Sequence, residues 1–207
     1  VDGVIADIGT NLEYETEVTI DASGLIAAPG LVDMHVHLRD PGQTEKEDII
    51  SGCKAAAAGG VTSVLAMPNT NPTVDNVETV KYIIEKGEKT GLTNVLPVGA
   101  VTKNMAGVEI TDVEELKKAG ICAISEDGKS VMNSGVYRKA MKNAAKANVP
   151  VLAHCEDINL VEGGVINLGD KSSELGVKGI SNAVEDVIAM RDITVSYTHL
   201  RAHATAA

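Results

Sequence analysis

The stretch LVDMHVHLRD, residues 31–40, combines an apolar β-strand pattern with two histidines near its end. Successive side chains of a strand alternate between its faces, so Asp33, His35 and His37 share one face and the opposite face is apolar. Polar groups at the end of an otherwise buried strand are typical of the carboxyl edge of a parallel barrel, where barrel enzymes carry their chemistry. The stretch therefore predicts a strand with a functional site at its end.

Outward from this strand, apolar runs alternate with helical patterns along the chain. Further strands are expected to start near residues 61, 94, 121 and 149. Helices are expected over residues 46–60, 76–90, 111–120, 134–148 and 181–193. Such a repeat is what βα units with crossover helices need to build a parallel sheet. Because a complete barrel needs eight units and about 250 residues, we predict a partial (β/α)8 barrel of the TIM type, with about five to six βα units.

Composition limits the classes of ligand and compartment. The 207 residues are 44% hydrophobic, without Trp or Phe, so the core must be aliphatic. Eighteen Lys and Arg against 29 Asp and Glu leave a net charge of −11, which disfavours nucleic acid and anionic membranes. Three cysteines without a disulfide-like spacing favour a reducing compartment, and no apolar stretch reaches the roughly 18 residues of a membrane span. We expect a cytoplasmic protein.

Polar residues also follow three other predicted strands. Asn69 lies between two prolines after the second strand, Asp127 precedes Gly128 after the fourth, and His154 follows the fifth. Since the carboxyl ends of parallel strands meet at one rim, these side chains are expected to converge on the two histidines of the first strand. Three imidazoles and a carboxylate suit zinc or a similar borderline metal.

Each of these residues has a simpler interpretation when taken alone. Asn69 and Asp127 could be turn residues, and His154 could be a hydrogen-bonded core histidine. The position of all of them at predicted strand ends favours a metal site.

Four motifs carry a family resemblance. HVHLRDPG, MPNTNP, SEDG and AHCED, in this order and spacing over approximately residues 20–193, resemble the metal-dependent amidohydrolases, most closely the single-chain bacterial dihydroorotases. The resemblance implies two zinc ions per chain. It implies that His35 and His37 bind one ion, that His154 binds the other, and that Asp127 bridges both.

The resemblance also implies how the substrate is bound. His37, Arg39 and Asn69 are expected to contact it, with Arg39 and Asn69 holding a carboxylate. Arginine suits this role because its planar fork pairs with carboxylates and stays charged. The alternative for Arg39 is a surface salt bridge with Asp40 or Glu45. The implied reaction is the reversible hydrolysis of the cyclic amide of (S)-dihydroorotate to N-carbamoyl-L-aspartate in pyrimidine synthesis.

Two other functions stay open. An allantoinase or hydantoinase would share the His-x-His motif and the barrel, but such enzymes usually bridge their metals with a carbamylated lysine, which SEDG lacks. A non-catalytic dihydroorotase-like scaffold subunit would bind a carbamoyltransferase, but such subunits tend to lose the metal ligands that are present here. The sequence does not choose between a homodimer and an association with a carbamoyltransferase.

The resemblance divides the chain into three parts. Residues 1–30 read as short β segments, the expected fragment of a small β domain that flanks the barrel in this family. Residues 31–193 form the expected partial barrel. Residues 194–207 do not continue the family pattern, and we expect a non-family, artefactual tail whose His199 and His203 belong to no metal site.

Two functional positions implied by the resemblance cannot be placed in this sequence. They are a metal-binding histidine on a sixth strand and an aspartate at the end of an eighth strand, which acts as general acid and base. We therefore expect a chain truncated at both ends, whose 207 residues do not by themselves turn over dihydroorotate.

Overall fold

The computed structural model describes residues 4–10 and 12–199, and its centre is a sheet of five parallel strands. The strands are β1 (Leu31–Val36), β2 (Val61–Ala66), β3 (Asn94–Ala100), β4 (Ala123–Ser125) and β5 (Val151–Leu152). The helices between them are α1 (Ile49–Ala58), α2 (Val77–Glu88), α3 (Val113–Ala119) and α4 (Ser134–Lys146), with the 3₁₀ helix η1 (Lys103–Met105) after β3. These elements confirm the predicted succession of βα units.

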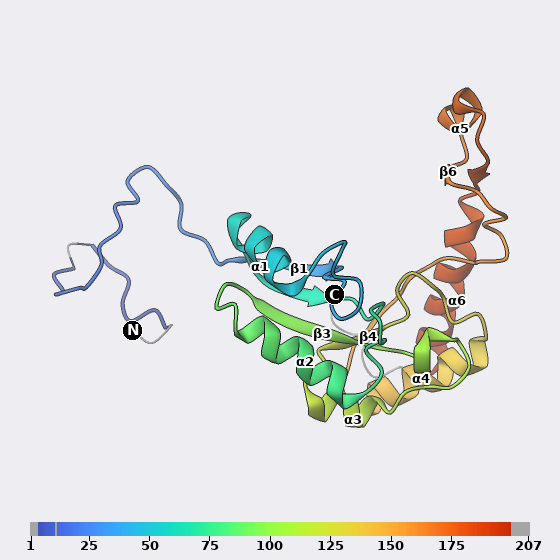
Figure 1. Cartoon of the computed structure of the whole chain (residues 1–207), viewed down its shortest axis with the longest axis horizontal. Helices are drawn as coiled ribbons and strands as arrows, with labels where there is room; N and C mark the ends of the chain where they lie inside the picture. Colours follow the sequence, from blue (N-terminus) through green and yellow to red (C-terminus); the bar gives the residue numbers. More distant parts are fainter. Residues whose placement is uncertain (1–3, 11, 200–207) are drawn as a thin grey trace.

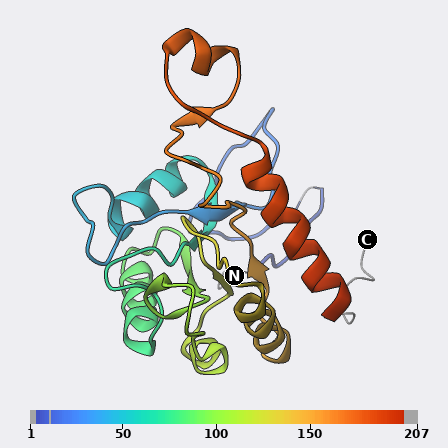
Figure 2. The ribbon, with the colours of Figure 1, turned by 90° about the vertical axis from the view of Figure 1, so that its right-hand side faces the viewer.

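The order of the strands in space is β1-β2-β3-β4-β5, the same as their order in the chain. In a doubly wound sheet the order of the strands reverses at a switch point, so that later strands are added on the other side of the first one. In a barrel each new strand is added beside the last. The sheet curls, and the helices lie along its outer side (Figure 1, Figure 2). The predicted partial (β/α)8 barrel is confirmed as a curled half-barrel.

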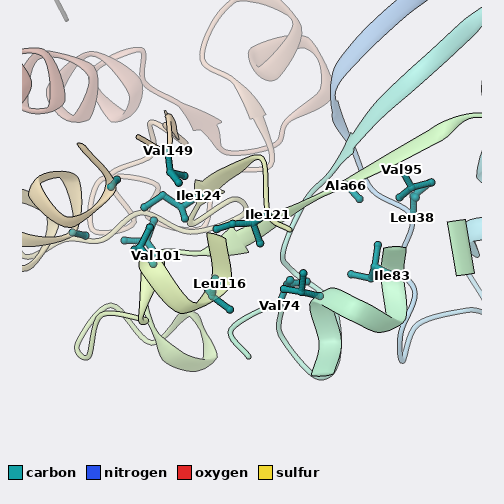
Figure 3. Close-up of a cluster of buried hydrophobic side chains, with 14 of the residues drawn as sticks. Leu38, Ala66, Val74, Ile83, Val95, Val101, Leu116, Ile121, Ile124 and Val149 are labelled. Atoms are coloured by element: carbon teal, nitrogen blue, oxygen red, sulfur yellow. The ribbon is translucent and has the colours of Figure 1, made fainter. Parts of the chain in front are cut away.

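The core is aliphatic and lies between the sheet and the helices, as Figure 3 shows for part of it. Helix α2 buries Val80 and Ile83, which are one turn apart and therefore face the same way. It packs so closely on β3 that a Cβ on Gly87 would lie 2.7 Å from the Cβ of Val95. Because β1, β2 and β3 run parallel, the loops that follow them lie at a common rim.

Strand β1 lies at the edge of the sheet and is covered only near its carboxyl end. Leu38 is buried, but Val32 and Met34, on the apolar face of the strand, are exposed. An edge strand has one neighbouring strand, and α1 begins only at Ile49, beyond the loop that carries the site.

The described part of residues 4–30 is extended and exposed and contains no strand, in contrast to the predicted β segments. A strand is held by hydrogen bonds to a neighbouring strand, and this segment runs apart from the sheet (Figure 1). Its assignment to a flanking β domain stays a prediction.

The chain after β5 contains an excursion that the sequence did not predict. Short strands β6 (Ile166–Asn167) and β7 (Gly179–Ile180) pair in parallel around helix α5 (Asp170–Leu175). The excursion projects away from the sheet (orange in Figure 2).

Helix α6 (Ala183–His199) packs against α4 and confirms the last predicted helix. It runs past residue 193 without a break, so no end of an element marks the predicted start of the tail. Residues 200–207, with His203, lie outside the described residues, and the assignment of 194–207 stays a prediction. Among the described helices, none combines the length and apolar composition needed to cross a bilayer.

Candidate metal centre

Three histidines surround one buried carboxylate at the carboxyl edge of the sheet. His35 lies in β1 and His37 just after it, Asp127 lies two positions beyond β4, and His154 two positions beyond β5. The Asp127 side chain is 4% exposed, whereas the three imidazoles are partly open to solvent. The fold therefore brings together all four residues that the sequence predicted as metal ligands.

The contacts join each imidazole to Asp127. The Nε2 atom of His35 and the Nδ1 atom of His154 lie 3.1 and 3.2 Å from Oδ1. The Nε2 atom of His37 lies 3.3 Å from Oδ2. Candidate ligand atoms of His35, His37 and Asp127 all lie within 4.8 Å of one another, so these three residues could hold a metal ion.

The chemistry of this cluster fits a cation. A carboxylate oxygen only accepts hydrogen bonds, so each imidazole nitrogen facing it needs either a proton or a shared positive ion. Neutral imidazoles and a carboxylate are the nitrogen and oxygen ligands that zinc prefers. The donor set therefore fits a metal site, as the sequence predicted.

The electrostatics of the cluster favour an ionised Asp127. Burial by itself would raise the pKa of this carboxyl, but the hydrogen bond from His154 and the charges of the three histidines outweigh it and lower the pKa. The hydrogen bond to Asp127 in turn raises the pKa of His154, although burial opposes this. The carboxylate is thus negative at neutral pH, as a metal ligand must be.

Asn69 lies between two of the proposed ligands. Its Oδ1 atom is 3.0 Å from Nδ1 of His37, and its Nδ2 atom donates to Oδ2 of Asp127 at 3.3 Å. A proton on Nδ1 of His37 that is donated to the Asn69 oxygen leaves the lone pair of Nε2 available to a metal ion held between His37 and Asp127. Asn69 also lines a cavity of about 250 Å³ together with Thr70, Thr73, Asn104, Met105, Asp127, Gly128 and Lys129. Asn69 is therefore more than a turn residue, because it hydrogen-bonds both His37 and Asp127.

Arg39 lies in the loop after β1, in the left-handed conformation with φ of 57°. The expected alternative, a salt bridge with Asp40 or Glu45, is absent: in the described chain no carboxylate pairs with the Arg39 guanidinium. Asp40 is instead paired with Lys86. Arg39 is half-buried, and among the described residues its side chain makes no hydrogen bond to the three histidines.

The loops that carry Arg39 and Asn69 are joined by hydrogen bonds. The side chain of Gln43 donates to the carbonyl of Asn69 at 3.1 Å, and its backbone N–H donates to the carbonyl of Arg39 at 2.9 Å. The N–H of Asn71 donates to the carbonyl of Pro41 at 3.0 Å. The two residues expected to hold a substrate carboxylate therefore lie in one connected pair of loops.

Gly42 permits this close approach, and we expect Gly42→Ala to lower the free energy of unfolding by about 3 kcal/mol. Its φ is +88°, and a Cβ would lie 1.8 Å from the carbonyl oxygen of Asn71. Gly60→Ala is the matched control, because Gly60 has a similar φ of +74° with open space around it. That variant should lose only about 1 kcal/mol, the cost of the left-handed backbone. Urea unfolding measures both, and equal losses would contradict the role of the close approach.

The sequence did not predict several residues that support the site. Glu156 places Oε2 at 3.1 Å from Nε2 of His154, and the Ser130 hydroxyl donates to the backbone carbonyl of His154. The buried Glu126 carboxylate accepts hydrogen bonds from the backbone N–H and hydroxyl of Thr102. Glu126 lies next to Asp127 in the motif SEDG, and Glu156 lies two positions after His154 in the motif AHCED. This proximity to the predicted metal ligands was the available signal.

A family model described as Dihydro-orotase-like matches residues 24–199. The chain belongs to this dihydroorotase-like family. Among curated dihydroorotases, that of Ruminiclostridium cellulolyticum is 47% identical over 204 residues, which are 98% of this chain and 48% of that protein. That of Geobacter metallireducens is 49% identical over 192 residues, 92% of this chain and 45% of that protein. The dihydroorotase-like chain thus spans about half the length of the curated relatives it matches.

Solved structures show the same fold at low sequence identity. The L-hydantoinase (dihydropyrimidinase) of Arthrobacter aurescens matches with a TM-score of 0.70 and 18% identity, over 90% of this chain and 43% of that one. The dihydroorotase of Saccharomyces cerevisiae, in complex with 5-fluoroorotic acid, matches with a TM-score of 0.57 and 18% identity, over 83% of this chain and 45% of that one. These likenesses establish the fold of the dihydroorotase-like chain and not its substrate.

Proposed function

We propose that this chain carries the first part of a dihydroorotase site, for the reversible hydrolysis of the cyclic amide of (S)-dihydroorotate to N-carbamoyl-L-aspartate. The observation that supports it is the convergence of three imidazoles on the buried Asp127, within a family whose curated relatives are dihydroorotases. The reaction belongs to pyrimidine synthesis, and the free cysteines of the described chain fit a cytoplasmic setting.

Two zinc ions would be held by four side chains. His35 and His37 would bind one ion and His154 the other, while Asp127, which contacts all three histidines, would bridge both. When bound, zinc supplies Lewis-acid polarisation of the amide carbonyl and a lowered pKa of water. Asn69 orients the imidazole of His37 through a hydrogen bond. Glu156 orients the imidazole of His154, and Ser130 holds the backbone carbonyl of His154.

The substrate carboxylate would be bound by Arg39. Its guanidinium has no carboxylate partner in the described chain, and it supplies positive charge in a protein with a net charge of −11. Asn69 and His37 would complete the contacts, since both line the rim beside Asp127. A carboxylate on the substrate ring is what distinguishes dihydroorotate from the simpler cyclic amides.

The alternative cyclic-amide hydrolases are less well supported. The central position between the histidines is occupied by Asp127 and not by a lysine that could be carbamylated. A non-catalytic scaffold would not need four converging ligands. Association as a homodimer or with a carbamoyltransferase stays a prediction.

The proposed function is tested by binding, because the residue that transfers the proton has not been placed in this sequence. We expect the zinc-loaded 207-residue chain to bind dihydroorotate and N-carbamoyl-L-aspartate in isothermal titration calorimetry. Arg39→Lys should weaken both by about tenfold to a hundredfold, because a lysine cannot reproduce the paired hydrogen bonds of the guanidinium.

The matched control is Arg138→Lys, on the exposed side of α4. It should leave both affinities unchanged. Absence of binding by the zinc-loaded wild-type chain would contradict the proposed function, and equal affinities in Arg39→Lys would contradict the role of Arg39.

A further inference from the structure

Asp40, the residue after Arg39, is a buried carboxylate with a complete set of partners. Its side chain is 1% exposed. The Tyr82 hydroxyl donates to Oδ1 at 2.8 Å, and the Lys86 ammonium lies 2.6 Å from Oδ2. The backbone N–H of Ile49, at the start of α1, donates to Oδ2 at 3.3 Å. A buried carboxylate is tolerated only when it is paired in this way.

The two side-chain partners come from the same face of helix α2. Tyr82 and Lys86 are four positions apart, and the ammonium of Lys86 also donates to the hydroxyl of Tyr82 at 3.1 Å. Because α2 packs closely on β3, its position is set by the core. The three side chains therefore connect a rigid helix to the loop after β1.

This connection reaches the residue proposed to bind the substrate carboxylate. Arg39 directly precedes Asp40 and has a left-handed backbone, which persists only where its surroundings hold it. Its carbonyl accepts from the N–H of Gln43, and the side chain of the next residue, Asp40, is held by α2. The peptide that joins Arg39 to Asp40 is thus fixed by contacts to two other parts of the chain.

We propose that Asp40, Tyr82 and Lys86 form a positioning network that orients Arg39 toward the carboxylate of the substrate. The inference rests on the proposed function, in which Arg39 binds that carboxylate. The three residues touch neither substrate nor metal, and they act through the backbone of Arg39. The network should therefore affect the affinity for the carboxylate ligand and leave the affinity for zinc unchanged.

The experiment compares Lys86→Met with Lys89→Met in the 207-residue chain. Both variants remove one positive charge from the end of α2, but only Lys86 reaches Asp40. In Lys86→Met, we expect dihydroorotate to bind about tenfold more weakly, as for a displaced binding group, with zinc affinity within twofold of wild type. Lys89→Met should match wild type in both, and Lys86→Arg should recover most of the lost affinity.

A second measurement reports on the loop without any ligand. Hydrogen exchange of the Gln43 amide, which donates to the carbonyl of Arg39, should become about tenfold faster in Lys86→Met, while amides of β3 keep their rates. Tyr82→Phe serves if Lys86→Met does not fold, because Tyr82 is 41% exposed and loses only its hydroxyl. The same pattern of effects is expected in both variants.

The outcomes separate the two proposals. Unchanged dihydroorotate affinity, or a parallel loss of zinc affinity and a faster exchange throughout the sheet, overturns the positioning role. If the zinc-loaded wild-type chain binds no dihydroorotate, the proposed function is overturned and this inference falls with it.

Discussion

Asp127→Asn is expected to weaken zinc binding by more than about a hundredfold. This loss exceeds the roughly tenfold to hundredfold loss expected when a residue that only hydrogen-bonds a metal ligand is removed. Asparagine has the shape of aspartate but not its charge, and its amide nitrogen would turn a donor toward one of the imidazoles. Asp127 is the group that all three histidines contact, so its loss removes the shared ligand of both proposed ions. Calorimetric titration of the 207-residue chain with zinc measures the effect.

Glu88→Gln is the control for this substitution. It removes one negative charge from an exposed position of α2, so it tests the long-range effect of charge without removing a ligand. Its zinc affinity should match that of the wild type, because exposed charges are screened by salt. If Asp127→Asn also stayed within threefold of wild type, the three imidazoles would not share an ion with this carboxylate.

Arg191→Met should lower the free energy of unfolding by roughly 3–5 kcal/mol, because it leaves a buried charge without its partner. The Arg191 side chain is 14% exposed, and that of Asp192 is 9% exposed. The guanidinium donates to Asp192 at 2.7 Å and to the backbone carbonyl of Val131 at 2.6 Å, and it lies 4.9 Å from the ring of Tyr137. These contacts fasten α6 to α4 and to the chain just after Ser130, which holds the backbone of His154.

Arg138→Met provides the matched control, because Arg138 is exposed on α4. Its substitution should change the free energy of unfolding by less than about 0.5 kcal/mol. The double variant Arg191→Met with Asp192→Leu should recover much of the loss, since replacing both members of a buried pair removes the unpaired charge. Urea unfolding followed by circular dichroism measures all three. A loss in Arg191→Met no larger than in Arg138→Met would show that the contacts of Arg191 do not hold α6 in place.

The same pair predicts a dependence on pH. Burial raises the pKa of Asp192, and its hydrogen bond with Arg191 offsets part of this rise. Because the folded chain holds this proton more tightly than the unfolded chain, the group stabilises the fold below the unfolded pKa, and that stabilisation is lost as the pH rises through the folded pKa. Without Arg191 the pKa of Asp192 should rise further. As the pH is raised, the free energy of unfolding of Arg191→Met should therefore keep falling up to a higher pH than that of the wild type.

Much of the half-barrel could be predicted from local patterns. The strand of residues 31–36 and the helix of residues 77–88 each show their own periodicity, and each lies where the sequence placed it. The expected strands before residue 30 are not formed in the described residues, because a strand also depends on a neighbour that its own pattern does not specify. The excursion around α5 escaped prediction for a similar reason, since its strands are two residues long and exist only as a pair.

The candidate site was predictable to the extent that it depends on strand ends. His35, His37, Asp127 and His154 follow from the rule that parallel strands present their carboxyl ends at one rim. Asn69 follows from the same rule, and it meets Asp127 across 58 positions of sequence. The contact of Tyr82 with Asp40 does not follow from it, because it joins a helix to a loop across 42 positions with no local pattern that links them.

The sequence by itself determined the order of the strands and helices, the aliphatic core, the net negative charge and the residue types available at the rim. The charge and the residue types follow from composition alone. The strands and helices follow from side-chain periods of two positions in a strand and of three to four in a helix, which any short window of the chain contains. Only the tertiary structure decided that three imidazoles share one carboxylate, that Asp40 is paired with Lys86, and that the Arg39 guanidinium is left without a carboxylate partner in the described chain. Such pairings depend on how distant elements pack and on which polar groups that packing removes from water.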